Sequence, residues 1–132
     1  MIAPMPSPAA LRRALVVEDD GAIAYLLRFL LERHGWQVSV AEDGLQAMQA
    51  IEHGEPPQLM LLDAMLPVHD GLTLLARLRS LPQWQGVPVV MLTAKGDEAF
   101  VAKAMATGAT DFVTKPFDVI QLAERLERLV PA

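Results

Sequence analysis

Short apolar runs alternate with amphipathic segments along most of this chain. Strand-like segments occupy residues 14–17, 37–41, 59–62, 87–92 and 111–114, of which 14–17 and 59–62 are continuous apolar runs. Runs this short are typical of strands that are buried on both faces of a parallel sheet. The pattern therefore predicts five strands, each covered on both sides.

The segments that follow these runs carry apolar residues at helical spacing. We expect helices over 21–34, from residue 45 to the residue before Gly54, from residue 72 to near Pro82, from Asp97 to Gly108, and over 119–129. Strand–helix alternation of this kind produces right-handed βαβ units. The predicted fold is therefore α/β: a doubly wound, five-stranded parallel sheet with helices on both faces.

Chemically active residues follow four of the predicted strands. Glu18 and Asp19 follow the first strand, Asp63 the third, Thr93 the fourth and Lys115 the fifth. The carboxyl ends of parallel strands meet at one edge of a sheet, where open α/β sheets bind ligands. Three carboxylates at one edge repel one another unless a cation lies among them, and oxygen ligands with room for water favour Mg²⁺. Lys115 adds a compact positive charge suited to pairing with Asp63.

This set of groups is suited to phosphoryl transfer. A carboxylate such as Asp63 is able to attack phosphorus and form an acyl phosphate. The reaction depends mainly on positioning and charge neutralisation, which Mg²⁺ and Lys115 provide, while Thr93 offers a hydroxyl donor. Two interpretations of the neighbouring Asp20 stay open: it assists the metal site, or it caps the helix that begins at residue 21.

Composition narrows the class of protein further. The chain has 132 residues, a net charge of −5, no cysteine and 52% hydrophobic residues. We expect a proline-rich leader at residues 1–11 and a single domain at residues 12–130. An acidic chain lacks the basic footprint of a nucleic-acid-binding domain. No apolar run is long enough to span a bilayer and no signal-peptide pattern is present, so we expect a cytoplasmic protein that does not bind membranes.

Several ordered motifs resemble the receiver domains of two-component response regulators. The matching segments are residues 15–20 (LVVEDD), 61–67 (LLDAMLP), 70–71 (DG), 90–94 (VMLTA), 108–109 (GA) and 115–117 (KPF). Together they cover the chain from about residue 12 to residue 130, which makes the resemblance far more specific than any single motif. It implies a CheY-like, flavodoxin-like (βα)5 fold.

The resemblance also implies roles for the residues at the sheet edge. Asp63 would accept a phosphoryl group from a histidine kinase or a histidine phosphotransfer protein. Thr93 would sense that group and Lys115 would pair with it. The implied ligands of Mg²⁺ are Glu18, Asp19, Asp63 and the backbone carbonyl of Met65. The peptide bond between Lys115 and Pro116 would be cis, which is a minority choice for such bonds.

Phe112 stands where this family carries its switch aromatic residue, often a tyrosine. On phosphorylation, Thr93 would move inward and the Phe112 ring would turn. The surface formed by residues 97–108, 111–114 and 119–129 would then bind a downstream protein or a second copy of the chain. Phe112 lacks a hydroxyl group, and the segment after Phe117 has no basic residue before Arg125. The second point argues against a dimer held by charged pairs on this surface.

In this family, the residues two positions after the acceptor and two after the threonine flank the path of the hydrolytic water. In this chain they are Met65 and Lys95. Because a methionine side chain offers no good hydrogen bond to orient water, we expect a long-lived phosphoryl group.

Two other classes of function, a phosphatase and a receiver that only docks, fit this sequence less well. A haloacid-dehalogenase-type phosphatase would need a second aspartate two residues after Asp63, where this chain has Met65. A receiver that only docks, without accepting phosphate, is disfavoured by the full set of acidic and lysine residues. The receiver itself fits either a stand-alone single-domain regulator or a piece of a multidomain response regulator or hybrid kinase.

Overall fold

Parallel strands form one sheet in the order β2-β1-β3-β4-β5. The structure, a computed structural model, describes residues 12–66, 69–94 and 96–130. In chain order the elements are β1 (Arg12–Val17), α1 (Gly21–Arg33), β2 (Trp36–Ala41), α2 (Gly44–His53), β3 (Leu59–Asp63), α3 (Gly71–Ser80), the 3₁₀ turn η2 (Pro82–Trp84), β4 (Val89–Ala94), α4 (Glu98–Thr107), β5 (Asp111–Lys115) and α5 (Val119–Leu129). The predicted fold class, a five-stranded doubly wound α/β sandwich, is confirmed.

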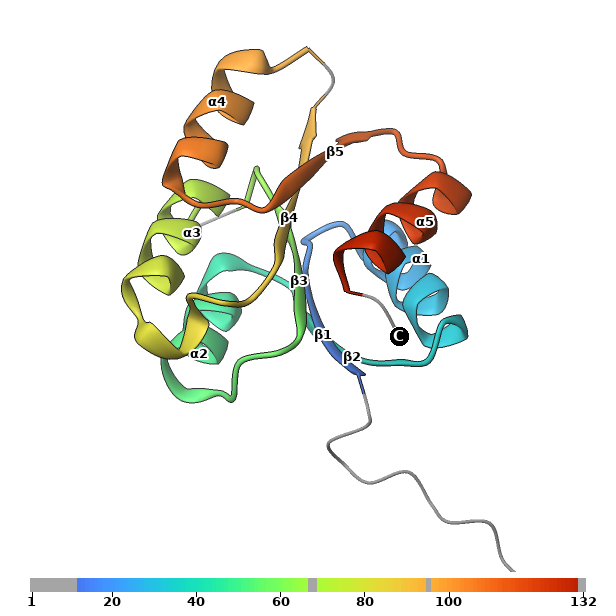
Figure 1. Cartoon of the computed structure of the whole chain (residues 1–132), viewed down its shortest axis with the longest axis horizontal. Helices are drawn as coiled ribbons and strands as arrows, with labels where there is room; N and C mark the ends of the chain where they lie inside the picture. Colours follow the sequence, from blue (N-terminus) through green and yellow to red (C-terminus); the bar gives the residue numbers. More distant parts are fainter. Residues whose placement is uncertain (1–11, 67–68, 95, 131–132) are drawn as a thin grey trace, which may run out of the picture.

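Helices cover the sheet on both faces, with α1 and α5 on one side and α2, α3 and α4 on the other (Figure 1). Successive side chains of β3 point to opposite faces and divide the core accordingly. Leu59 and Leu61 pack in the cluster that includes residues of α1 and α5. Met60 and Leu62 pack in the cluster that includes residues of α2 and α3. This two-sided burial explains why the strand reads as a continuous apolar run.

The two edge strands depart from the expectation that every strand is buried on both faces. In β2, Gln37 and Ser39 are exposed, and every residue of β5 is only half-buried. Within the part of the chain that the structure describes, each of these strands has a neighbouring strand on one side only, β1 for β2 and β4 for β5. Only the three central strands are therefore enclosed on all sides.

The observed bounds differ from the predicted ones where local chemistry intervenes. The fourth strand begins at Val89 rather than at residue 87. Pro88 has no backbone N–H to donate to a neighbouring strand, which moves the start of regular pairing past it. The expected leader at residues 1–11, as well as Lys95, lies outside the described residues. Within the described ranges, no helix is both long and apolar enough to cross a membrane.

An aspartate immediately precedes the first turn of every α-helix. In each case the aspartate side chain accepts a backbone N–H from that turn, which satisfies one or two of the donors that a helix start leaves open. The capping residues are Asp20, Asp43, Asp70, Asp97 and Asp118. The capping interpretation of Asp20 is confirmed, because its side chain accepts the N–H groups of Ala22 and Ile23 at the start of α1.

Candidate functional site

The sheet brings the predicted site residues to one edge. Glu18 and Asp19 directly follow β1, Asp63 is the last residue of β3, and Lys115 is the last residue of β5. Thr93 lies one residue before the end of β4. The strand order reverses direction between β1 and β3, so the site lies at the switch point where open α/β sheets form their crevices.

Three carboxylates form a tight cluster at this edge. Glu18, Asp19 and Asp63 each offer an oxygen atom, and these atoms all lie within 4.8 Å of one another. Glu18 is 1% exposed and Asp63 is 4% exposed, whereas Asp19 lies at the surface. Two buried carboxylates beside an open one form an oxygen-rich site that solvent reaches from one side. Such a donor set fits a hard divalent cation that keeps some of its water, as Mg²⁺ does.

Lys115 bridges the two buried carboxylates. Its Nζ donates to Oε2 of Glu18 at 2.9 Å and to Oε1 at 3.1 Å. Its distance to Oδ1 of Asp63 is longer, 3.4 Å. The expected pairing with Asp63 is therefore present, but Glu18 holds the ammonium group more closely. The peptide bond from Lys115 to Pro116 is cis, as the resemblance implied.

The pKa values of Glu18, Asp63 and Lys115 are all raised above their ordinary values, but from different causes. Burial raises the pKa of Glu18 and of Asp63 above the ordinary carboxyl value, against the opposing effect of Lys115. Burial of the Lys115 ammonium acts to lower its pKa, but the hydrogen bond to Glu18 and the charges of Asp63 and Glu18 outweigh it and raise the pKa. The lysine therefore stays charged, and the two carboxylates are held at an electrostatic cost that a further cation would relieve.

A hydrogen bond and a close approach of α3 hold the backbone around Asp63 in place. Oδ1 of Asp63 accepts the backbone N–H of Met65 at 3.1 Å. The start of α3 lies against it as well: a Cβ atom on Gly71 would come within 2.6 Å of the Asp63 carbonyl oxygen. Only glycine permits this approach, which sets the helix beside the acceptor strand. The Met65 side chain itself is 74% exposed, so only its main chain is held at the site.

Thr93 carries a buried hydroxyl group without a partner. The residue is 2% exposed, and its Oγ1 has no hydrogen-bond partner among the described residues. The hydroxyl does not cap α4, because that cap is the Asp97 side chain, which accepts the Phe100 N–H at 3.2 Å. A buried hydroxyl that lacks a partner costs free energy. A ligand oxygen that enters the site would supply the missing acceptor.

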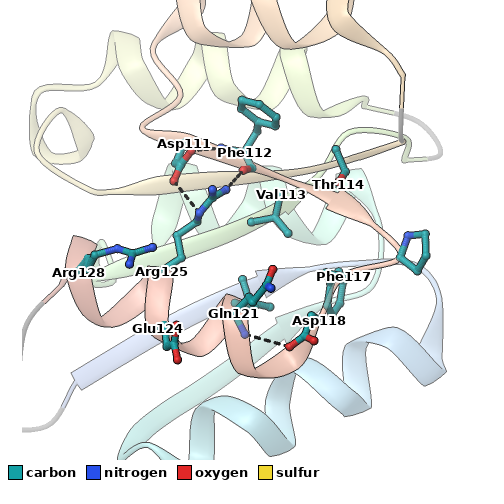
Figure 2. A pocket seen from close by; sticks show the side chains of 12 residues that line it. Asp111, Phe112, Val113, Thr114, Phe117, Asp118, Gln121, Glu124, Arg125 and Arg128 are labelled. Atoms are coloured by element: carbon teal, nitrogen blue, oxygen red, sulfur yellow. Dashed lines mark hydrogen bonds and ion pairs between the residues drawn. The ribbon is translucent and has the colours of Figure 1, made fainter.

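Phe112 is half-buried in β5 and packs against the cluster on the α2, α3 and α4 side. Its backbone has two side-chain partners that the sequence pattern does not indicate. Its carbonyl accepts Nη1 of Arg125 at 2.6 Å, and its N–H donates to Oδ1 of Asp111 at 2.8 Å. Figure 2 shows Asp111, Arg125 and Phe112 gathered beside a groove between β5 and α5. No spacing rule links Arg125 to a backbone carbonyl, so sequence reasoning missed this network.

Comparison with known proteins gives a consistent result. The family model for the response regulator receiver domain matches residues 14–127. The phosphate regulon transcriptional regulatory protein PhoB of Rhizobium meliloti is 38% identical over 120 residues, which is 91% of this chain and 52% of that protein. The chain thus spans about half the length of the curated relatives it matches.

Solved structures agree with the sequence comparison. A putative response regulator from Chloroflexus aurantiacus superposes with a TM-score of 0.84 at 33% identity, covering 92% of this chain and 98% of that one. The receiver domain of a sensor histidine kinase from Pseudomonas aeruginosa, described with a magnesium ion coordinated in its active site cleft, superposes with a TM-score of 0.81 at 27% identity. It covers 92% of this chain and 98% of that one. The acidic cluster and the strand order agree with these matches. The family-model match shows that the chain belongs to the response regulator receiver domain family of two-component signalling.

Proposed function

We propose that Asp63 accepts a phosphoryl group from a phosphohistidine of a histidine kinase or a histidine phosphotransfer protein. The observation that carries this proposal is the surroundings of Asp63: a nearly buried carboxylate beside Lys115, with the unpartnered Thr93 hydroxyl at the same sheet edge. Receiver domains are signalling domains that interact with histidine kinases, and this chain shares their motifs across its matched length.

Glu18, Asp19, Asp63 and the backbone carbonyl of Met65 would hold Mg²⁺. The three side chains fit the ion because their oxygens lie close together and carry excess negative charge. The magnesium described in the Pseudomonas aeruginosa receiver domain supports this assignment by similarity. When bound, Mg²⁺ neutralises charge on the acceptor and on the incoming phosphoryl oxygens.

The transfer step follows from the groups of this chain. An Asp63 carboxylate oxygen attacks phosphorus, an O–P bond forms, and the N–P bond of the phosphohistidine breaks. The bonding electrons leave with the imidazole, which keeps or takes up a proton from solvent. Lys115 neutralises one phosphoryl oxygen, and Thr93 donates its hydroxyl to another. Hydrolysis reverses the modification, so we assign the domain only its own phosphorylation and dephosphorylation and no turnover of free substrates.

The output of this switch would lie on the surface of α4, β5 and α5. Inward movement of Thr93 would be coupled to a turn of the Phe112 ring, and the altered surface would bind a downstream protein or a second copy of the chain. Relatives of this chain include proteins named as DNA-binding response regulators. We propose that this acidic receiver makes no direct contact with nucleic acid, either as a single-domain regulator or as the receiver of a longer one.

The test is phosphorylation by acetyl phosphate. Intact-mass spectrometry of the parent chain with Mg²⁺ is expected to show one added phosphoryl group, which Asp63→Ala lacks and which chelation of Mg²⁺ prevents. The parent should show no sustained turnover of a small phosphate ester, which a haloacid-dehalogenase-type phosphatase would hydrolyse. Absence of the phosphoryl group from the parent as well as from the variant would instead favour a domain that only docks.

A further inference from the structure

Among the described residues, β5 pairs with β4 only, so its other edge has no strand partner there. An open edge presents backbone N–H and carbonyl groups that lack a strand partner. Successive residues of a strand point their backbone N–H and carbonyl groups to opposite sides. The contacts of Phe112 place its N–H and its carbonyl on the open side.

Two side chains close this edge at Phe112. The Asp111 carboxylate accepts the Phe112 N–H at 2.8 Å, and Arg125 of α5 donates to the Phe112 carbonyl at 2.6 Å. Arg125 and Asp111 also pair with each other, with Nε 3.5 Å from Oδ2. Figure 2 shows the two contacts of Arg125, to Asp111 and to the Phe112 carbonyl, as dashed lines between α5 and β5. We call this closed set of contacts the Asp111–Arg125 clasp.

We propose that Arg125 is a positioning residue for the switch, which holds the main chain of Phe112 through the clasp and thereby favours the unphosphorylated arrangement. This inference rests on the proposed function, because it assigns regulation to the same site. The clasp contacts the backbone of the residue whose ring is expected to turn. It also ties the edge strand to α5, the two elements whose surface is expected to change.

The direction of the effect follows from linkage. Contacts that are present in one state and lost in the other stabilise the first state. They therefore lower the affinity of any ligand that binds better to the second state. The clasp belongs to the ligand-free structure, and movement of β5 relative to α5 strains the two contacts that Arg125 makes between them, to the Phe112 carbonyl and to Asp111. A hydrogen bond to a charged group changes an equilibrium by roughly three- to ten-fold when it is partly exposed, as the one to Arg125 is.

Beryllofluoride is a phosphoryl mimic that binds carboxylates. Its affinity for the full chain reports the equilibrium between the unphosphorylated and phosphorylated arrangements. Calorimetric titration in the presence of Mg²⁺ is expected to show three- to ten-fold tighter binding to Arg125→Ala than to the parent. Arg125→Lys retains the charge but not the two-point contact, and it should fall between them. The matched control is Arg128→Ala, since Arg128 lines the same groove and makes no hydrogen bond to β5 among the described residues.

The outcomes separate the two proposals. If the parent binds no beryllofluoride, the proposed function fails. If the parent binds it and Arg125→Ala binds equally well or more weakly, the clasp is only structural and the inference fails. Circular dichroism checks that each variant is folded, and Asp111→Asn provides a second opening of the clasp if Arg125→Ala does not fold. Tighter binding by Asp111→Asn supports the inference, and unchanged binding overturns it.

Discussion

The ammonium group of Lys115 donates to both carboxylate oxygens of Glu18, at 2.9 and 3.1 Å. This contact is closer than the 3.4 Å distance from Lys115 to Asp63. The fully buried Glu18 therefore shares its charge with a protein cation before any metal arrives. A metal ion at the cluster would compete with Lys115 for the charge of Glu18, and Lys115 already lies close enough to Asp63 to face a phosphoryl group there.

Glu18→Gln tests this arrangement. The substitution keeps the shape of the side chain and a hydrogen-bond acceptor for Lys115, but it removes one negative charge from the cluster. We expect Mg²⁺ affinity, measured by isothermal titration calorimetry, to fall at least about ten-fold. Glu98→Gln changes the net charge equally on the exposed start of α4 and should leave the affinity unchanged. Equal Mg²⁺ affinity in Glu18→Gln and the parent would remove Glu18 from the metal site.

The stability of the domain should depend on pH through Asp63. Burial raises its folded-state pKa above the ordinary value of 3.8, so the folded chain binds its proton more tightly than the unfolded chain does. The stabilisation that comes with the proton is fully present below the unfolded pKa and is lost as pH rises through the folded pKa. At neutral pH without divalent ions, the charged Asp63 therefore destabilises the fold.

Asp63→Asn removes that charge and keeps the shape. In chelator at pH 7, we expect its thermal midpoint to lie roughly 3–6 °C above that of the parent. The difference should shrink as the pH falls through the raised pKa of Asp63 in the folded chain, because the parent also becomes neutral at this position. Thermal melts of both proteins across this range provide the measurement. A variant that is less stable at pH 7, or a difference that is independent of pH, would contradict this account of the buried carboxylate.

Met65 offers a test of phosphoryl lifetime. Its side chain is exposed and apolar, two residues after Asp63, and its main chain is held by the Asp63 carboxylate. We expect Met65→Asn to lose the phosphoryl group several-fold faster with Mg²⁺ present, because an amide is able to orient the attacking water. Release of inorganic phosphate from the phosphorylated chain measures the rate. Met65→Leu is the matched apolar control, and a rate for Met65→Asn equal to the control would refute the idea.

Arg79 joins three segments on the side of the sheet away from α1. Its guanidinium donates to the backbone carbonyls of Trp84, Gln85, Val87 and Gly108. Since a lysine has a single point charge, Arg79→Lys cannot keep all these bonds and should lower the free energy of unfolding by about 2 kcal/mol. Arg77→Lys, on the same helix, alters an exposed pair with Glu52 and a 3.5 Å contact to the Ser80 hydroxyl, and it should scarcely move the urea midpoint. Similar losses in both variants would contradict this role of Arg79.

The strand pattern was sufficient to predict that Glu18, Asp63 and Lys115 lie together, because parallel strands place their carboxyl ends at one edge of the sheet. Asp63 and Lys115 are far apart in the sequence, and the topology alone brings them within contact. How Lys115 divides its contacts could not be predicted, since that depends on the depth and length of the Glu18 side chain. Arg79 and Arg125 were not identified either. Their partners are backbone carbonyls, and a backbone carbonyl is the same for every residue type.

The 3₁₀ turn η2 could not be predicted from the sequence pattern either, because its position depends on the assembled fold. The pattern predicts no element at residues 82–84, yet Trp84 there is fully buried and its Nε1 donates to the Ile51 carbonyl at 3.1 Å. A single aromatic residue between proline and glycine gives no periodic signal. Its burial arises from the gap that the neighbouring helices leave, which only the assembled fold defines.

The most direct test of the central claim is to locate the phosphoryl group. After incubation with acetyl phosphate and Mg²⁺, reductive trapping of the acyl phosphate with borohydride followed by peptide mass spectrometry identifies the modified residue. We expect a single modification, at Asp63, that disappears when Mg²⁺ is chelated. Modification at Asp19 or at any other carboxylate, with Asp63 unchanged, would contradict the account of the site.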